Sequence, residues 1–263
     1  MTDGDRAGLL VVDMQNDFCS GGALPVPNGD RVVSALNRYI DDALAHGVTV
    51  YASRDWHAAV TNHFKPYGGP WPPHCVQDSD GARFHPNLRL PATAIIVTKG
   101  EDPNSPGYSA FEGRTPEGKS FLADLRERGI CHLYVGGLAT DYCVKQSALD
   151  ALSAGLQVTV LEDAVAGVEP DGSARALVQM GERGAHVASG SPVGRQGLSR
   201  GNYAAVTPFV GSPIRQECCA ASGRDIPADL CTRRGPVTRA REEFRAIGRD
   251  AIVQSCRRSS APD

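Results

Sequence analysis

Long hydrophobic runs are missing from this chain of 263 residues. The longest ones, at residues 8–12 and 94–97, fall far short of the roughly 20 apolar residues that a transmembrane helix requires. The first residues, MTDGDRAG, are acidic and lead straight into an apolar run, so we do not expect a signal peptide. We therefore expect a cytoplasmic protein without a membrane partner.

A strong net charge is also missing, because 27 basic residues are set against 30 acidic ones. The charge is unevenly distributed, however. Residues 1–190 have a net charge of −8, from 15 basic and 23 acidic side chains, whereas residues 191–263 have +5, from 12 and 7. The basic residues of the second part are all arginines, but they lack the interleaved aromatic residues typical of nucleic-acid binding. We expect no nucleic-acid partner.

Cysteine is well represented, with eight residues divided equally between these two parts. In a chain without an export signal, thiols are more often reduced, catalytic or metal-bound than paired in disulfides. With 41% hydrophobic and 22% charged residues, the composition is that of a folded globular protein.

The first 190 residues alternate short apolar runs with helical patterns. The apolar runs predict strands at residues 8–13, 48–53, 94–98, 132–137, 156–161 and 185–189. Apolar residues at helical spacing predict helices at residues 30–45, 120–128, 142–154 and 171–183, the first of them capped by Asp30. Such alternation is typical of a parallel sheet covered on both faces. We predict an α/β fold, a three-layer α/β/α domain over residues 1–190 with a mainly parallel sheet of about six strands.

From residue 191 this alternation stops, and Gly, Arg, Ser and Pro dominate. Phe244, Ile247 and Ala251 have helical spacing and indicate one short amphipathic helix. We expect residues 191–263 to be an Arg-rich extension that is otherwise largely disordered.

Two long connections interrupt the pattern inside the predicted domain, at residues 54–91 and 100–118. Each begins where a predicted strand ends, which is the edge at which open α/β sheets bind ligands. Long loops in a compact domain are usually functional. We therefore expect the functional site at this edge.

An acid, a cation and a thiol also follow predicted strands. Asp13 ends GLLVVD, Lys99 follows AIIVT, and Cys143 follows HLYVGGLATDY at the start of a helix. A thiol needs a base, a nearby cation or a helix N-terminus to become a strong nucleophile, and this group offers all three. Taken singly, Asp13 is more typical of a turn residue and Cys143 of a buried structural cysteine. The polar turn before Cys143 favours the catalytic interpretation, and its backbone N–H groups are suited to hold an oxyanion.

A second group of polar residues lies in the loop SRDWHAAVTNHFKPYGGPWPPHC. Asp55 and His57 are two positions apart and face the same side of an extended segment, and His63 and His74 follow. Nitrogen and oxygen donors without a thiolate suit one divalent ion such as zinc, iron or manganese. Each histidine alone would be read as a surface residue, but three in one loop favour a metal site. We interpret Cys75 as a packing residue.

These segments together resemble the nicotinamidase and pyrazinamidase branch of the isochorismatase-like cysteine hydrolases. The resemblance rests on five motifs in order across residues 8–190: VVDMQNDFCSGGALPV, SRDWHAAVTNHF, WPPHC, TKGEDPNSPGYSAFEG and GGLATDYCVKQSALDA. No motif of the family matches residues 191–263.

The resemblance implies a role for each matching residue. The catalytic residues would be Asp13, Lys99 and Cys143, the metal ligands Asp55, His57 and His74 with His63 as an auxiliary, the oxyanion hole Ala139 and Cys143, and the substrate contacts Phe18, Trp71, Leu138 and Ala139. It also implies a non-proline cis peptide between Leu138 and Ala139.

The implied reaction is the hydrolysis of nicotinamide, and of its pyrazine analogue, through a cysteine thioester in NAD salvage. Two alternatives stay open: another amide or carbamoyl hydrolase on the same scaffold, and a metal-binding protein without turnover in which Cys143 is structural. The metal loop argues against the first, because hydrolases of this group that act on other substrates generally lack the Asp/His set. A homo-oligomer is one option for the assembly of the chain.

Overall fold

The computed structural model describes residues 6–190 of the chain. The extension that we predict at residues 191–263, including the helix around Phe244, lies outside the described residues. Within the described part, no helix is long and apolar enough to cross a membrane.

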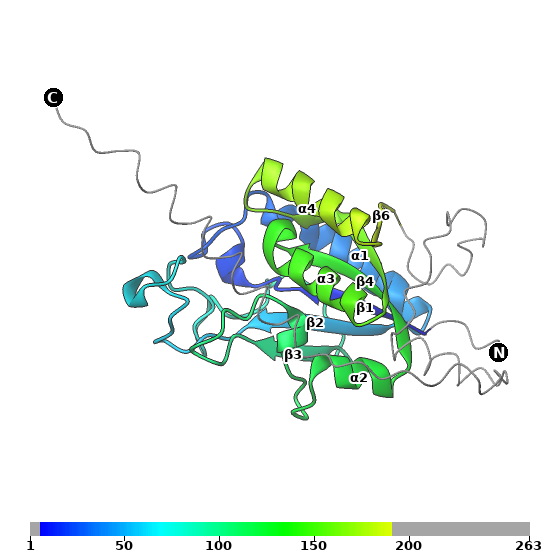
Figure 1. Cartoon of the computed structure of the whole chain (residues 1–263), viewed down its shortest axis with the longest axis horizontal. Coiled ribbons are helices and arrows are strands. Elements are labelled where there is room, and N and C mark those ends of the chain that lie inside the picture. The colour runs from blue at the N-terminus through cyan, green and yellow to red at the C-terminus, as the bar shows by residue number, and fades with distance from the viewer. Residues whose placement is uncertain (1–5, 191–263) are drawn as a thin grey trace, which may run out of the picture. The chain divides into compact units, whose positions relative to one another are not determined.

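Six parallel strands form a sheet in the order β3-β2-β1-β4-β5-β6 (Figure 1). Their bounds are β1 Arg6–Val12, β2 Thr49–Asp55, β3 Ile95–Lys99, β4 Ile130–Leu138, β5 Gln157–Ala166 and β6 His186–Ala188. The apolar runs of the sequence form these strands because their side chains are buried on both faces of the sheet, as is usual for parallel strands. The prediction of an α/β fold with a mainly parallel sheet of about six strands is confirmed.

Helices cover both faces of this sheet. The bounds are α1 Val32–Ala45, α2 Phe121–Glu127, α3 Lys145–Ser153 and α4 Pro170–Glu182. Apolar residues of α1 belong to one buried cluster, and those of α2, α3 and α4 belong to a second cluster on the opposite face. The helices of Figure 1 therefore form two layers around the sheet, and the three-layer prediction is confirmed.

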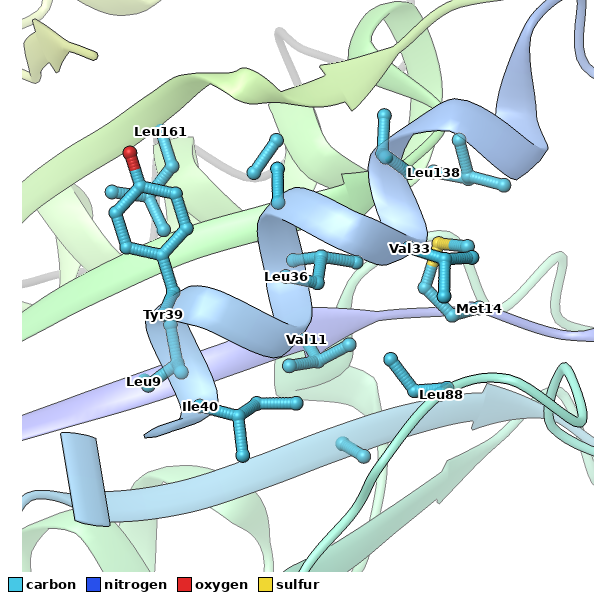
Figure 2. Packing of buried hydrophobic residues seen from close by; sticks show 14 of the residues in the cluster. Leu9, Val11, Met14, Val33, Leu36, Tyr39, Ile40, Leu88, Leu138 and Leu161 are labelled. Carbon is cyan, nitrogen blue, oxygen red and sulfur yellow. The ribbon is translucent and has the colours of Figure 1, made fainter. Parts of the chain in front are cut away.

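The central strand β1 shows how the sequence divides between the two layers. Leu9 and Val11 belong to the cluster under α1, whereas Leu10 and Val12 belong to the opposite cluster. Figure 2 shows Leu36 of α1 packed close to Val11, with Leu9 in the same cluster. Because alternate strand residues point to opposite faces, a continuous apolar run serves both layers. Burying a leucine or valine contributes about 1.5–3 kcal/mol, so each layer is held by several such side chains.

The predicted cap of the first helix is wrong. A short 3-10 turn, Gly29–Arg31, precedes α1, and Arg31 occupies the N-cap position without a side-chain hydrogen bond. The carboxylate of Asp30 instead accepts a hydrogen bond from the backbone N–H of Ser20 at 3.0 Å. Asp30 does not cap the helix, because its carboxylate binds the backbone N–H of Ser20 instead. It thereby links the preceding loop to the start of α1.

The helix predicted at residues 142–154 has a different start. It opens with a π-helical turn, Thr140–Val144, and continues as α3. Turns of this kind inside helices are rare and are frequent at functional sites. Cys143 lies in this turn.

Candidate active site

Four neighbouring strands each bring one polar side chain to the carboxyl edge of the sheet. Asp55 and Lys99 are the last residues of β2 and β3, Asp13 follows β1, and Cys143 lies in the turn after β4. All four side chains are buried. Because the carboxyl ends of parallel strands meet at one edge, residues far apart in sequence become neighbours. The structure brings the predicted acid, cation and thiol together and places Asp55 beside them.

Lys99 is the centre of this group. Its Nζ atom lies 2.8 Å from Oδ2 of Asp13, 2.5 Å from Oδ1 of Asp55 and 2.9 Å from the carbonyl oxygen of Gly107. These three acceptors match the three protons of an ammonium group. The Sγ atom of Cys143 is a fourth neighbour at 3.6 Å. Although burial alone would lower the pKa of Lys99, the two carboxylates raise it well above its usual value, so the side chain is a permanent cation.

Asp13 adopts a left-handed backbone conformation, with a φ of 46°. Asp tolerates this region better than most residues, and the conformation turns the chain sharply at the end of β1. One carboxylate oxygen accepts a hydrogen bond of 2.7 Å from the Ser53 hydroxyl, and the other faces Lys99. Burial raises the pKa of Asp13, while the charge of Lys99 opposes this effect. A raised pKa improves the affinity of a carboxylate for a proton, which is what a general base needs.

The thiol of Cys143 is protonated in this environment. Burial raises its pKa well above the ordinary value, Lys99 opposes that effect, and the charges of Asp13 and Asp55 add to it. One carboxylate oxygen of each aspartate and the Sγ atom lie within 4.8 Å of one another. The Cys143 thiol therefore lies beside carboxylates that could accept its proton.

The turn that carries Cys143 is held by two hydrogen bonds to one carbonyl oxygen. The oxygen of Ala139 accepts hydrogen bonds from the backbone N–H groups of Tyr142 and Val144, at 3.0 and 3.1 Å. The peptide bond between Leu138 and Ala139 is cis, which confirms the conformation implied by the family resemblance.

Asp141 anchors the same turn from the other side. Its carboxylate accepts hydrogen bonds from the backbone N–H groups of Val168 and Glu169, at 3.0 and 3.1 Å, where α4 begins. A Cβ atom at Gly167 or Gly172 would lie 2.9 or 3.0 Å from the oxygens of this carboxylate. The two glycines therefore give the α4 backbone room to approach Asp141.

Three histidines gather on the other side of Asp55. One ring nitrogen each of His57, His63 and His74 lies within 4.8 Å of the other two, and all three residues are buried. The Oδ2 atom of Asp55 lies 3.6 Å from Nε2 of His57 and 4.0 Å from Nε2 of His74. Asp55 therefore contacts Lys99 with one carboxylate oxygen and faces two histidines with the other.

The contacts of these rings fit a metal ion. The Nδ1–H groups of His57 and His74 donate to the carbonyl oxygens of Gly100 and Pro72, at 3.1 and 2.8 Å, which leaves Nε2 as the electron-pair donor of each ring. The buried Nε2 atom of His57 has no hydrogen-bond partner among the described residues. Burial lowers the pKa of His63 to about 4 and also lowers that of His74, so both rings are neutral at physiological pH, as metal binding requires.

Aromatic side chains lie against the histidines and against Tyr142 of the turn that carries Cys143. Phe18 lies next to His74, with ring centroids 5.4 Å apart, and the ring of Trp71 meets that of Tyr142 at 5.1 Å. The indole N–H of Trp71 donates a hydrogen bond of 2.8 Å to the hydroxyl of Tyr108. The predicted contacts Phe18 and Trp71 are therefore near the site, together with two tyrosines that the sequence analysis did not identify.

Sequence patterns do not identify several residues that support the site, and the reason is the same for each. Ser53, Tyr108 and Asp141 form hydrogen bonds to residues distant in sequence. No spacing pattern in one sequence marks such contacts. Tyr108 had the strongest available signal, because it follows Gly107 in a long loop that begins at Lys99.

Comparisons with known proteins agree with this geometry. A model of the isochorismatase domain matches residues 7–191. The nicotinamidase of Escherichia coli strain K12 is 47% identical over 195 residues, which span 67% of this chain and 92% of that protein. The nicotinamidase/pyrazinamidase of Mycobacterium tuberculosis strain H37Rv is 41% identical over 175 residues, or 65% of this chain and 92% of that protein. The crystal structure of the pyrazinamidase of Pyrococcus horikoshii in complex with zinc superposes with a TM-score of 0.66 and 43% identity, covering 70% of this chain and 99% of that one.

Proposed function

The chain belongs to the isochorismatase domain family, and on that premise we propose that it is a nicotinamidase, an amidohydrolase that converts nicotinamide and water into nicotinate and ammonia. The observation that carries the proposal is the buried contact of Lys99 with Asp13, Asp55 and Cys143. In this proposal Cys143 is the nucleophile, Asp13 the base and Asp55 a metal ligand, and all three contact one cation. Hydrolysis of pyrazinamide is part of the proposal, because the two substrates share an aromatic ring with one carboxamide.

The first step forms the covalent intermediate. Asp13 accepts the proton of the Cys143 thiol, and the sulfur attacks the carboxamide carbon. The backbone N–H groups of Ala139 and Cys143 are the proposed donors to the oxyanion that develops on the carbonyl oxygen. Lys99 favours this step because its fixed positive charge lies 3.6 Å from the sulfur and offsets the negative charge that forms there.

The second step releases ammonia. The proton held by Asp13 passes to the amide nitrogen, the C–N bond breaks, and a thioester of Cys143 remains. Water then attacks the thioester carbon while Asp13 accepts one of its protons. Nicotinate leaves, and the proton returns from Asp13 to the sulfur. The net change is the addition of one water molecule across the C–N bond.

Asp55, His57, His63 and His74 would hold one divalent metal ion, either zinc, iron or manganese. The donor set suits such an ion. It consists of the neutral rings of His63 and His74, the Nε2 atom of His57, which has no hydrogen-bond partner among the described residues, and Oδ2 of Asp55. When bound, the metal supplies a Lewis acid that fixes the ring nitrogen of the substrate. A similar protein was solved in complex with zinc, which supports the assignment without selecting this metal.

Phe18, Trp71, Leu138 and Ala139 are the proposed contacts of the substrate ring. Phe18 and Leu138 are buried apolar residues of the same core cluster as Ala139. Trp71 is held by its hydrogen bond to Tyr108. A flat aromatic ring gains most from such rigid apolar walls, because burial of its faces carries the binding energy. The small-molecule substrate is the only partner that we propose. A cytoplasmic location stays a prediction.

Release of ammonia from nicotinamide tests the function directly. The metal-loaded protein should release one ammonia for each nicotinate formed, and the same preparation should be offered a carbamoyl compound and pyrazinamide. Turnover of the carbamoyl compound alone would replace our assignment by another hydrolase of the same scaffold. Metal binding without turnover of any amide would favour the non-enzymatic alternative.

A further inference from the structure

Gln15 is a fully buried polar residue that the mechanism above does not use. It lies two positions after Asp13, and its backbone N–H donates to the carbonyl oxygen of Asp13 at 2.8 Å. Its side chain points to the neighbouring strand β2 rather than to the reacting groups.

The side-chain amide of Gln15 forms hydrogen bonds with both backbone groups of Asp55, its N–H and its carbonyl oxygen. Its Oε1 atom accepts from the N–H of Asp55 at 2.8 Å, and its Nε2 atom donates to the carbonyl oxygen of Asp55 at 2.8 Å. The second N–H of the amide donates to the carbonyl oxygen of Ala82, also at 2.8 Å. These partners fix the orientation of the amide, because a flipped group would place NH₂ against an N–H and oxygen against two carbonyls.

This contact takes the place of missing strand pairing. The ladder between β1 and β2 extends from Gly8 paired with Thr49 to Val11 paired with Ala52, and it does not include Asp55. On the other side of Asp55, β3 continues the pairing through Lys99. The amide of Gln15 offers one acceptor and one donor to Asp55, as a peptide group of β1 would in a longer ladder. Asp55 is thereby held from two sides, by β3 and by Gln15.

The backbone of Asp55 has to be held in place because its two carboxylate oxygens face different groups. Oδ1 lies 2.5 Å from Lys99, while Oδ2 faces Nε2 of His57 and of His74. A small rotation or shift of the residue would improve one contact at the expense of the other. Precise support of this kind is typical of groups that orient metal ligands.

We propose that Gln15 is a positioning residue, which holds the backbone of Asp55 so that its carboxylate contacts Lys99 and the metal together. The inference rests on the metal site proposed above. It extends that site to a residue in the segment after β1, through contacts with the main chain of a ligand rather than with its carboxylate.

Co²⁺ binding to the full-length protein tests the proposal, because the visible absorption of Co²⁺ reports its coordination geometry without turnover. Gln15→Met keeps the length of the side chain and removes all three hydrogen bonds. Gln15→Glu keeps the acceptor and removes the donors. Loss of a contact that orients a ligand typically costs about 10- to 100-fold in metal affinity, so we expect both variants to bind Co²⁺ at least about tenfold more weakly, with altered absorption bands.

A second buried amide provides the matched control. Asn37 also joins two segments by its side chain, donating to the carbonyl oxygen of Asn87 at 2.9 Å and accepting from the N–H of Arg89 at 2.8 Å. Among the described residues, no hydrogen bond or ion pair joins it to the four proposed ligands. Asn37→Leu should cost comparable stability and leave the Co²⁺ affinity and spectrum as in the wild type. An effect common to all three variants would show a merely structural role for Gln15 and overturn the proposal.

Ammonia release by the wild type separates this proposal from the proposed function. If the wild type hydrolyses nicotinamide and both Gln15 variants bind Co²⁺ normally, the role of Gln15 alone is refuted. If the wild type hydrolyses no amide but the Gln15 variants lose Co²⁺ selectively, the function is refuted and the role of Gln15 is supported. A wild type that binds no Co²⁺ refutes the metal site and the role of Gln15 together.

Discussion

The Nζ atom of Lys99 lies 2.5 Å from Oδ1 of Asp55, and this ion pair joins the thiol to the three histidines. The same ammonium group contacts Asp13 and Cys143, while the other oxygen of Asp55 faces His57. A buried cation between two buried carboxylates is strongly stabilised only as long as all partners are present, because removing one leaves an uncompensated charge. The proposed reaction centre and the proposed metal site therefore depend on each other.

Replacing Cys143 by alanine should lower kcat for nicotinamide hydrolysis by at least about 1000-fold, because Cys143 forms the thioester in the proposed mechanism. The side chain removed is small and the charged groups around it remain. The melting temperature and the bound metal should therefore stay close to those of the wild type. Ammonia release, thermal unfolding and elemental analysis on the same preparation measure the three quantities. Substantial remaining turnover would rule out covalent catalysis by Cys143.

Asp13→Asn should lower kcat by about 10²- to 10⁴-fold, the usual contribution of a general base. The substitution keeps the shape of the side chain and can keep the hydrogen bond from Ser53, but it removes the proton acceptor and one of the two negative charges beside Lys99. Single-turnover measurement of thioester formation is the direct test. Ser53→Ala serves as the control that removes only the hydrogen bond and should have a much smaller effect. Equal rates for wild type and Asp13→Asn would assign the base to another residue.

Loss of one histidine ligand should weaken metal binding and substrate binding together. His57→Ala and His74→Ala should lower metal affinity by more than the roughly 10- to 100-fold that outer contacts contribute. His63→Ala should be the mildest of the three, because the structure gives it no close contact with Asp55. Elemental analysis after dialysis against a weak chelator, together with KM, measures both effects. Wild-type metal content in His57→Ala and His74→Ala would disprove the ligand assignment.

The hydrogen bond from Trp71 to Tyr108 should contribute to binding of the substrate ring. Trp71→Phe and Tyr108→Phe each remove this bond and keep an aromatic side chain. A typical net hydrogen bond is worth about 1 kcal/mol, so loss of the Trp71 orientation that it fixes should raise KM by at most about fivefold, with little change in kcat. In the double variant the effects should not add, since the same bond is lost only once. Additive effects would show that the two residues act independently.

Deletion of residues 191–263 should leave kcat and the melting temperature nearly unchanged. All residues assigned to the site lie between positions 13 and 143, and the last strand of the sheet ends at Ala188. Ordering a chain segment costs about 1–2 kcal/mol per residue, and the extension has few large apolar residues to offset this cost. Comparison of the truncated and complete proteins by ammonia release and thermal unfolding checks the expectation. Insolubility or loss of most activity would place the domain boundary later in the chain.

Hydrophobic patterning was sufficient to predict the sheet. The run GLLVVD predicts β1 because a strand buried on both faces needs apolar residues at successive positions, and Leu9 and Leu10 indeed belong to opposite clusters. Strand ends were predicted to within a few residues, although β5 extends to Ala166 rather than position 161. The convergence of Asp13, Lys99 and Cys143 followed from the same rule, since parallel strands end at one edge.

Contacts between single side chains and distant backbone groups were beyond the reach of the sequence. The hydrogen bonds of Gln15 to Asp55 and of Asp141 to Glu169 depend on how loops approach the sheet. The cap of α1 was misassigned for the same reason, because Asp30 bonds to the N–H of Ser20 in the loop before the helix. Local propensity describes what a residue can do within its own segment, and these residues act between segments.

The assembly of the site from four adjacent strands makes activity a measure of completed folding. Lys99 is separated from Asp55 and from Cys143 by 44 positions each, so no short fragment contains the reacting groups. Contacts of such long range require large loops to close and form slowly compared with helices. During refolding, hydrolysis should therefore return only after helical circular dichroism has recovered. At each time of refolding, the rate of turnover should be proportional to the number of molecules in which β3, β2, β1 and β4 have all paired.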